Sequence, residues 1–156
     1  MKNQKLFLDA DYEDEITLAL VRLSKKTAHH EFFFEVNHLS GSQFERITDI
    51  EITGTYYNYF HARFQAYHKE TKTCFQFLAN PSHYSIKKKE VTELFTEEQS
   101  VNYLLPIHKD VDYILKTSDS FADFSLILLP ENLVFPLQEI QLSSQEELYQ
   151  LIQYYE

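Results

Sequence analysis

The segment between residues 104 and 116 constrains the fold most, because an apolar run stops there at a proline and resumes as an alternating pattern. Pro106 has no backbone N–H and favours extended geometry in the residue before it, so one element should end at Leu105 before a polar connection. A strand is predicted from about Val111. Its alternate residues are Val111, Tyr113 and Leu115 on one face and Asp112, Ile114 and Lys116 on the other. This alternation predicts a strand whose odd-numbered face lies on the core.

A β-hairpin is predicted in the middle of the chain. Residues 60–67 alternate between apolar and polar side chains, a polar turn covers 69–72, and an apolar run follows at 74–78. Further strands are predicted at 6–8, 16–23, 49–53 and 133–137, and Ala19 and Leu23 make a helix the alternative for 16–23. Pro136 favours an edge position for the last of these, because proline cannot donate to a strand ladder.

Apolar residues at helical spacing predict helices in three places. The first covers 25–39, with Ser24 as its N-cap and Gly41 after its end. The second begins at a pattern like a capping box in 120–123 and stops at Pro130. The third is the clearest, because a serine at 143 or 144 precedes a glutamate by three residues. Its apolar stripe consists of Leu148, Leu151, Ile152 and Tyr155.

These elements predict one α+β domain over residues 1–156, a mostly antiparallel sheet with a central hairpin, packed by two or three helices. A chain of 156 residues is long enough to bury roughly 68–70% of its unfolded surface without disulfides. Cys74 is the single cysteine, which suits a reducing cytoplasm. The apolar run near residue 7 is too short for a signal peptide, and no run is long enough to span a membrane. A cytoplasmic protein is therefore expected.

The charge of the chain is acidic and unevenly distributed. The formal net charge is −10, which disfavours binding to nucleic acid because that affinity depends on lysine and arginine. After Lys116 there is no lysine or arginine, whereas seven aspartates or glutamates remain. Such a stretch is typical of a solvated acidic face, and it could also meet a basic partner.

Leu105-Pro106, followed by Asp112-Tyr113 and the apolar Ile114-Leu115, resembles the signature of the bacterial IPExxxDY family. The opening segment 5–9 and Asn37-His38-Leu39 are also similar to members of that family. Ile107 stands where the signature has glutamate, and Asp112 lies one position later than the name of the family specifies. The resemblance implies a small cytoplasmic protein without an assigned activity, and it supplies no catalytic residues.

The N-terminal carboxylates Asp9, Asp11 and Glu13 are the candidate metal ligands. They follow a predicted strand, and carboxylates at such a strand end can hold Mg²⁺, as in haloacid-dehalogenase-like phosphatases. Glu13 stands where that pattern has threonine, so an acidic connection between two elements is the simpler interpretation. The seven histidines lack the spacing of zinc ligands. No metal or cofactor is predicted.

These observations predict a non-enzymatic protein-interaction or adaptor module that binds an unidentified protein, with Pro106, Asp112 and Tyr113 as candidate binding residues. Asp112 is expected either to cap a backbone N–H group or to meet a ligand, and Tyr113 to pack its ring in the core. The alternative is a small divalent-metal-dependent hydrolase or ligand-binding enzyme that uses the three N-terminal carboxylates. A homodimer is also predicted, from the edge position of Pro136 and the aromatic Tyr154-Tyr155 end.

Overall fold

Seven strands form one sheet in the computed structural model, which describes residues 15–88 and 100–155. The strands are β1 Glu15–Val21, β2 Glu45–Thr53, β3 Tyr57–His68, β4 Thr73–Ala79, β5 Tyr84–Lys87, β6 Tyr113–Thr117 and β7 Gln138–Ser143. Their order is β2-β3-β4-β6-β1-β7, and β5 pairs with the first part of β3. All of these pairs are antiparallel. The α+β class and the mostly antiparallel sheet are therefore confirmed.

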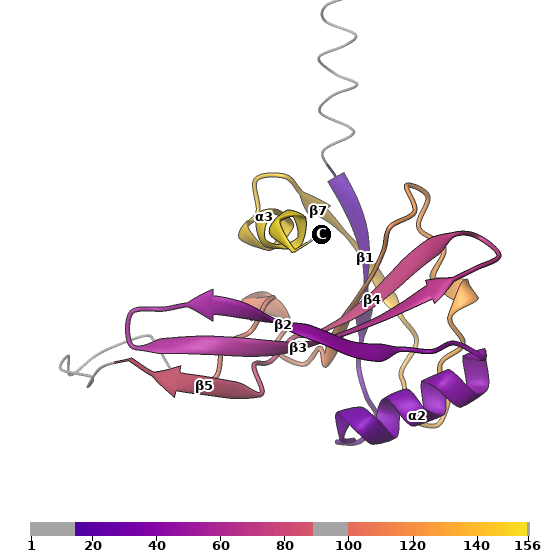
Figure 1. Cartoon of the computed structure of the whole chain (residues 1–156), viewed down its shortest axis with the longest axis horizontal. Helices are drawn as coiled ribbons and strands as arrows, with labels where there is room; N and C mark the ends of the chain where they lie inside the picture. Colours follow the sequence, from indigo (N-terminus) through magenta and orange to yellow (C-terminus); the bar gives the residue numbers. More distant parts are fainter. Residues whose placement is uncertain (1–14, 89–99, 156) are drawn as a thin grey trace, which may run out of the picture.

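Two α-helices lie on opposite faces of this sheet (Figure 1). They are α2 His29–Ser40 and α3 Glu147–Tyr154. On the first face, Phe32, Phe33 and Val36 of α2 are buried against the sheet. On the other face, Leu148 and Ile152 of α3 pack in a second cluster.

The central strands are buried on both faces, which corrects the expectation that only the odd-numbered face of the 111–116 strand meets the core. Tyr113 and Leu115 of β6 lie in the cluster under α2, whereas Ile114 lies in the cluster under α3. β1 follows the same rule, because Leu18 and Leu20 face α3 while Ala19 and Val21 face α2. The sequence of a strand that is buried on both faces is a nearly continuous apolar run and does not alternate with polar residues.

The start of α2 differs from its prediction, while its end agrees. Ser24 does not cap it, because the backbone N–H and hydroxyl of Ser24 donate to Leu133 and Asn132 across the sheet edge. Ala28 occupies the N-cap position without a side-chain hydrogen bond. Gly41 follows the last helical residue at a φ of 64°, the left-handed conformation that glycine adopts most readily.

The hairpin and the strand after residue 15 are confirmed, as β3–β4 and β1. β2 begins earlier than predicted and contains a register shift between Ile47 and Ile50. The predicted strand at 6–8 lies outside the described residues. No helix in the described part of the chain is long and apolar enough to cross a membrane.

Two predictions between residues 120 and 143 were wrong. The helix predicted to end at Pro130 is only a 3-10 turn, η2 Phe124–Leu126, in which Asp123 accepts from the Ser125 backbone N–H. The strand predicted at 133–137 lies later, as β7, and before it only Val134 forms an isolated bridge, with Leu23. Most apolar side chains of the 122–137 segment instead pack in the cluster beside α2, namely Ala122, Phe124, Leu126, Ile127, Leu129, Val134 and Leu137.

Candidate functional site

A cleft of about 1020 Å³ opens where the connection from β1 to α2 passes the end of β4 and the start of β6. We call it the α2 cleft. Its lining consists of Leu23, Ser24, Lys25, Lys26, Thr27, Ala28, His29, His30, Arg46, Phe64, Ala79, Pro81, Asp110, Asp112 and Tyr113. Two of the three predicted binding residues therefore lie in one cavity.

Asp112 and Tyr113 both make internal contacts at this cleft. The Asp112 carboxylate accepts a hydrogen bond of 2.7 Å from the backbone N–H of Leu23, and burial raises the pKa of Asp112. Tyr113 is 2% exposed, its ring stacks on Phe32, and its hydroxyl bonds to Nδ1 of His29. Burial also raises the pKa of Tyr113. Of the two alternatives for Asp112, the structure contains the backbone cap.

Pro106 lies apart from the other two candidates. It begins a 3-10 turn, η1 Pro106–His108, and lines a separate groove of about 580 Å³ beside α3 and β7. Asn80, which is fully buried, fixes this loop, because its amide donates to His108 and Val111 and accepts from the Leu105 N–H. The three candidate binding residues are therefore divided between two surfaces, with Pro106 in the groove beside α3 and Asp112 and Tyr113 in the α2 cleft.

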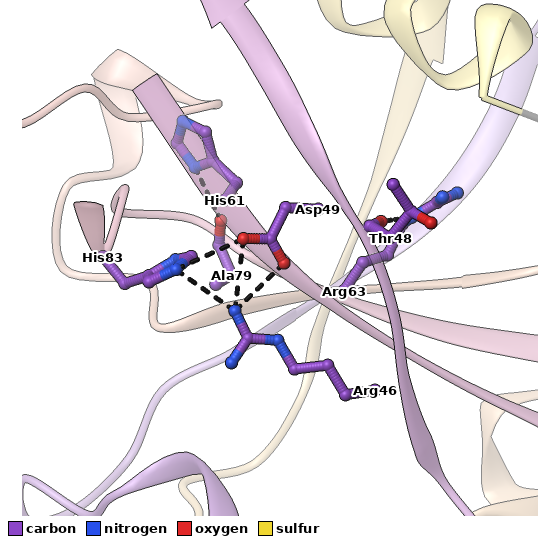
Figure 2. A network of polar contacts seen from close by, with 7 residues as sticks. All are labelled: Arg46, Thr48, Asp49, His61, Arg63, Ala79 and His83. Carbon is purple, nitrogen blue, oxygen red and sulfur yellow. Dashed lines mark hydrogen bonds and ion pairs between the residues drawn. The ribbon is translucent and has the colours of Figure 1, made fainter. Parts of the chain in front are cut away.

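A polar network at the cleft joins residues that sequence reasoning did not select (Figure 2). Nη2 of Arg46 lies 3.0 and 3.2 Å from the two Asp49 carboxylate oxygens, and 3.1 Å from Nε2 of His83. That His83 nitrogen is also 3.3 Å from Asp49. The Arg46 guanidinium lies 5.8 Å from the centre of the Phe64 ring. These contacts hold Arg46 in place at the wall of the cleft.

The irregularity in β2 places Asp49 in this network. Between Ile47 and Ile50 the strand has one residue more than its partner β3, and such a bulge redirects side chains. Arg63 of β3 donates to the Thr48 carbonyl at 2.9 Å (Figure 2). It also donates to the Tyr155 carbonyl at 3.1 Å, and so ties the bulge to the end of α3.

His29 lies close to the network. Its ring centre is 5.3 Å from that of Phe64 and 6.5 Å from that of His83. Burial, followed by the charges of Arg46 and His83, lowers the pKa of His29. The carboxylate of Asp49 acts in the opposite direction and does not cancel this shift in the pKa.

His61 has a structural role. It is fully buried, with Nδ1 3.0 Å from the Ala79 carbonyl and Nε2 3.2 Å from the side-chain amide of Asn102. This arrangement matches a neutral ring that donates from Nδ1 and accepts at Nε2. Burial lowers the pKa of His61 to about 4.

A second surface is a groove of about 720 Å³ formed by the 122–139 segment, which we call the acidic groove. Its apolar lining consists of Ala122, Phe124, Ile127, Leu128, Leu129, Val134, Phe135, Pro136 and Leu137. Asp123, Glu131 and Glu139 lie around it, and no lysine or arginine among the described residues contributes to the lining. The lack of lysine and arginine after Lys116 was the sequence signal for this surface, but the wrong secondary structure there concealed the groove itself.

The candidate metal ligands Asp9, Asp11 and Glu13 lie outside the described residues. Within 15–88 and 100–155, no group of three histidine, cysteine, aspartate or glutamate side chains is arranged to hold a metal ion. Cys74 is a half-buried free thiol.

Comparison with known proteins gives no significant match to a family model, a curated protein or a solved structure. The resemblance to the IPExxxDY family therefore stays a prediction.

Proposed function

We propose that this chain is a non-enzymatic protein-interaction module, and that the acidic groove takes a basic, apolar-faced segment of a partner protein. The observation that carries the proposal is the combination of an exposed apolar floor with a rim on which every charged side chain of the described residues is a carboxylate. The floor favours an apolar face on the bound segment, and the rim favours a positive charge on it.

The floor of the groove offers apolar area for docking. Leu128 and Phe135 are 54% and 53% exposed, while Phe124 and Ile127 beneath them are buried in the core cluster under α2. The exposed side chains are therefore mounted on a packed base. Exposed apolar area of this kind, rimmed by polar residues, is typical of sites where another protein binds.

The rim selects the charge of the occupant. Glu131 and Glu139 are exposed, and they make no hydrogen bond or ion pair with any residue that the structure describes. A segment that carries lysine or arginine beside apolar residues would be attracted, whereas an acidic segment would be repelled. A second copy of this acidic chain is a poor occupant for the same reason.

Fluorescence anisotropy tests this proposal with a labelled peptide composed of leucine and lysine. We expect it to bind at least about tenfold more tightly than a counterpart with glutamate in place of every lysine, because the rim repels the second peptide. Glu131→Lys combined with Glu139→Lys should reverse this preference, and Phe135→Ser should weaken both peptides.

Matched variants outside the groove separate docking from general attraction to an acidic protein. Glu45→Lys combined with Glu70→Lys changes the net charge equally at exposed positions elsewhere. Tyr67→Ser removes an aromatic ring that is 56% exposed. Binding that responds to these controls as strongly as to the groove variants would refute the proposal.

A further inference from the structure

We propose that the α2 cleft is a binding site for a phosphorylated small molecule, separate from the acidic groove. Lysine, arginine and histidine side chains line this cleft together with apolar groups. The proposed function does not use this cleft.

Arg46 is the side chain that is best prepared to hold an anion. Asp49, His83 and the Phe64 ring fix its guanidinium, so little side-chain freedom is lost when a ligand binds. Only Nη2 is engaged by the network, and the other terminal nitrogen points away from Asp49 and His83 (Figure 2). The Arg46 side chain is 45% exposed, so this edge is accessible.

Three further groups add positive charge or donors near Arg46. Lys25 and Lys26 line the cleft, and their ammonium groups make no hydrogen bond or ion pair with any described residue. His29 is tied through Nδ1 to Tyr113 and has no hydrogen bond at Nε2 within the described part of the chain. The lowered pKa of His29 reflects nearby positive charge as well as burial.

The carboxylates near the cleft are already occupied. Asp49 pairs with Arg46, Asp110 lies 2.6 Å from Nε of Arg22, and Asp112 accepts the Leu23 N–H. Asp49 and Asp110, which are paired with arginines, therefore oppose an incoming anion less than unpaired carboxylates would. The lysines and the outer edge of Arg46 remain as donors.

Phosphate fits this set better than a single carboxylate, because it carries more charge and accepts hydrogen bonds from several directions. The cleft of about 1020 Å³ is within the range of small-molecule sites, and it is far larger than one phosphate group. Leu23, Ala28 and Pro81 in its lining are exposed or half-buried, so they offer apolar surface for the organic part of the ligand.

Isothermal titration calorimetry with AMP, pyrophosphate, adenosine and citrate tests this inference, with NMR signals of the His29 ring as a second readout. We expect AMP and pyrophosphate to bind and to shift the His29 signals. Adenosine and citrate should bind at least about tenfold more weakly, because the first lacks the phosphate and the second offers only carboxylates.

Two sets of variants assign the site. Arg46→Gln should weaken AMP at least about tenfold, since a charge-assisted hydrogen bond is lost. Lys25→Gln combined with Lys26→Gln removes two exposed charges without disturbing packing and should weaken AMP as well. Lys69→Gln combined with Lys72→Gln, in the exposed β3–β4 turn, should leave the affinity unchanged.

Four results would overturn the inference. The first is that neither AMP nor pyrophosphate binds at millimolar concentration. The second and third are that adenosine binds as tightly as AMP, or that citrate binds as tightly as pyrophosphate. The fourth is that the Lys69→Gln, Lys72→Gln control loses as much affinity for AMP as the cleft variants do. The peptide measurements on the acidic groove use different residues, so either proposal can fail while the other stands.

Discussion

The Asp112 carboxylate accepts a hydrogen bond from the backbone N–H of Leu23, just after the end of β1. Asp112→Asn removes the charge but keeps an acceptor oxygen for the Leu23 N–H. The free energy of unfolding should therefore fall by no more than about 0.5–2 kcal/mol, which is what a lost cap costs. Asp112→Ala leaves the Leu23 amide without this acceptor and should cost more, about 1–3 kcal/mol. Urea unfolding at pH 7 measures both values.

The same variants separate a structural role for Asp112 from a role in recognition. We expect Asp112→Asn to bind the leucine-lysine peptide as the unmodified protein does. A variant with an unchanged melting temperature that no longer binds the peptide would instead make Asp112 a recognition residue.

His61 should make the protein sensitive to acid. Because its pKa in the folded state is about 4 and that of an unfolded histidine is about 6.5, only the unfolded state takes up the proton between these values. The free energy of unfolding should therefore fall as the pH decreases from 6.5 to 4, by up to about 3 kcal/mol from this residue. Above pH 6.5 its contribution is fully present.

The variant His61→Asn isolates this contribution, because its amide can still donate to Ala79 but does not titrate. It should be less stable than the unmodified protein at pH 7.5 and should show a shallower loss of stability toward pH 4.5. Urea unfolding across that range checks the difference, and parallel curves for the two proteins would contradict it.

Among the secondary-structure elements, α3 packs against the sheet through only some of the apolar residues predicted to form its buried face. Leu148 and Ile152 are 5% and 2% exposed, whereas Leu151 is half-buried at the margin of the cluster. Ile152→Ala should therefore cost about 2–5 kcal/mol and Leu151→Ala clearly less. A larger loss for Leu151→Ala in denaturant unfolding would show that α3 docks in another orientation.

The elements that the sequence predicted correctly are those with local signals. The alternation of 60–67 and the polar turn after it predicted the hairpin, and Gly41 marked the end of α2. The helix predicted before Pro130 and the strand predicted at 133–137 were wrong because distant contacts decide the conformation of this segment. Phe135 donates its N–H to Arg22, and Leu128 accepts from the Ser40 hydroxyl. No periodicity near residue 130 indicates either partner.

The candidate sites also differ in whether a local sequence signal predicts them or distant contacts decide them. Strand alternation and the position of Asp112 before β6 were enough to predict the buried ring of Tyr113, and they gave a backbone cap as one of two roles for Asp112. The network of Arg46, Asp49 and His83 was not predictable, because it depends on a bulge in β2 and on a residue 37 positions away. The groove beside Phe135 was hidden because its segment has almost no regular structure.

At the scale of the whole molecule, the sequence predicts a homodimer. β7 is the last strand of the sheet, with no partner on its outer side in the described part of the chain. Tyr154 is 82% exposed and can add aromatic contact area. We expect the mass from light scattering to rise toward that of a dimer with protein concentration, and a monomer mass at the highest concentration would contradict this.

NMR mapping with the leucine-lysine peptide shows where on the protein the peptide docks. In ¹⁵N-labelled protein, we expect the shifted backbone amides to cluster within 122–139 because the acidic groove is the docking surface, and we expect the Glu131→Lys, Glu139→Lys variant to lose these shifts. Shifts that cluster elsewhere, or that spread evenly over the exposed acidic residues, would contradict it.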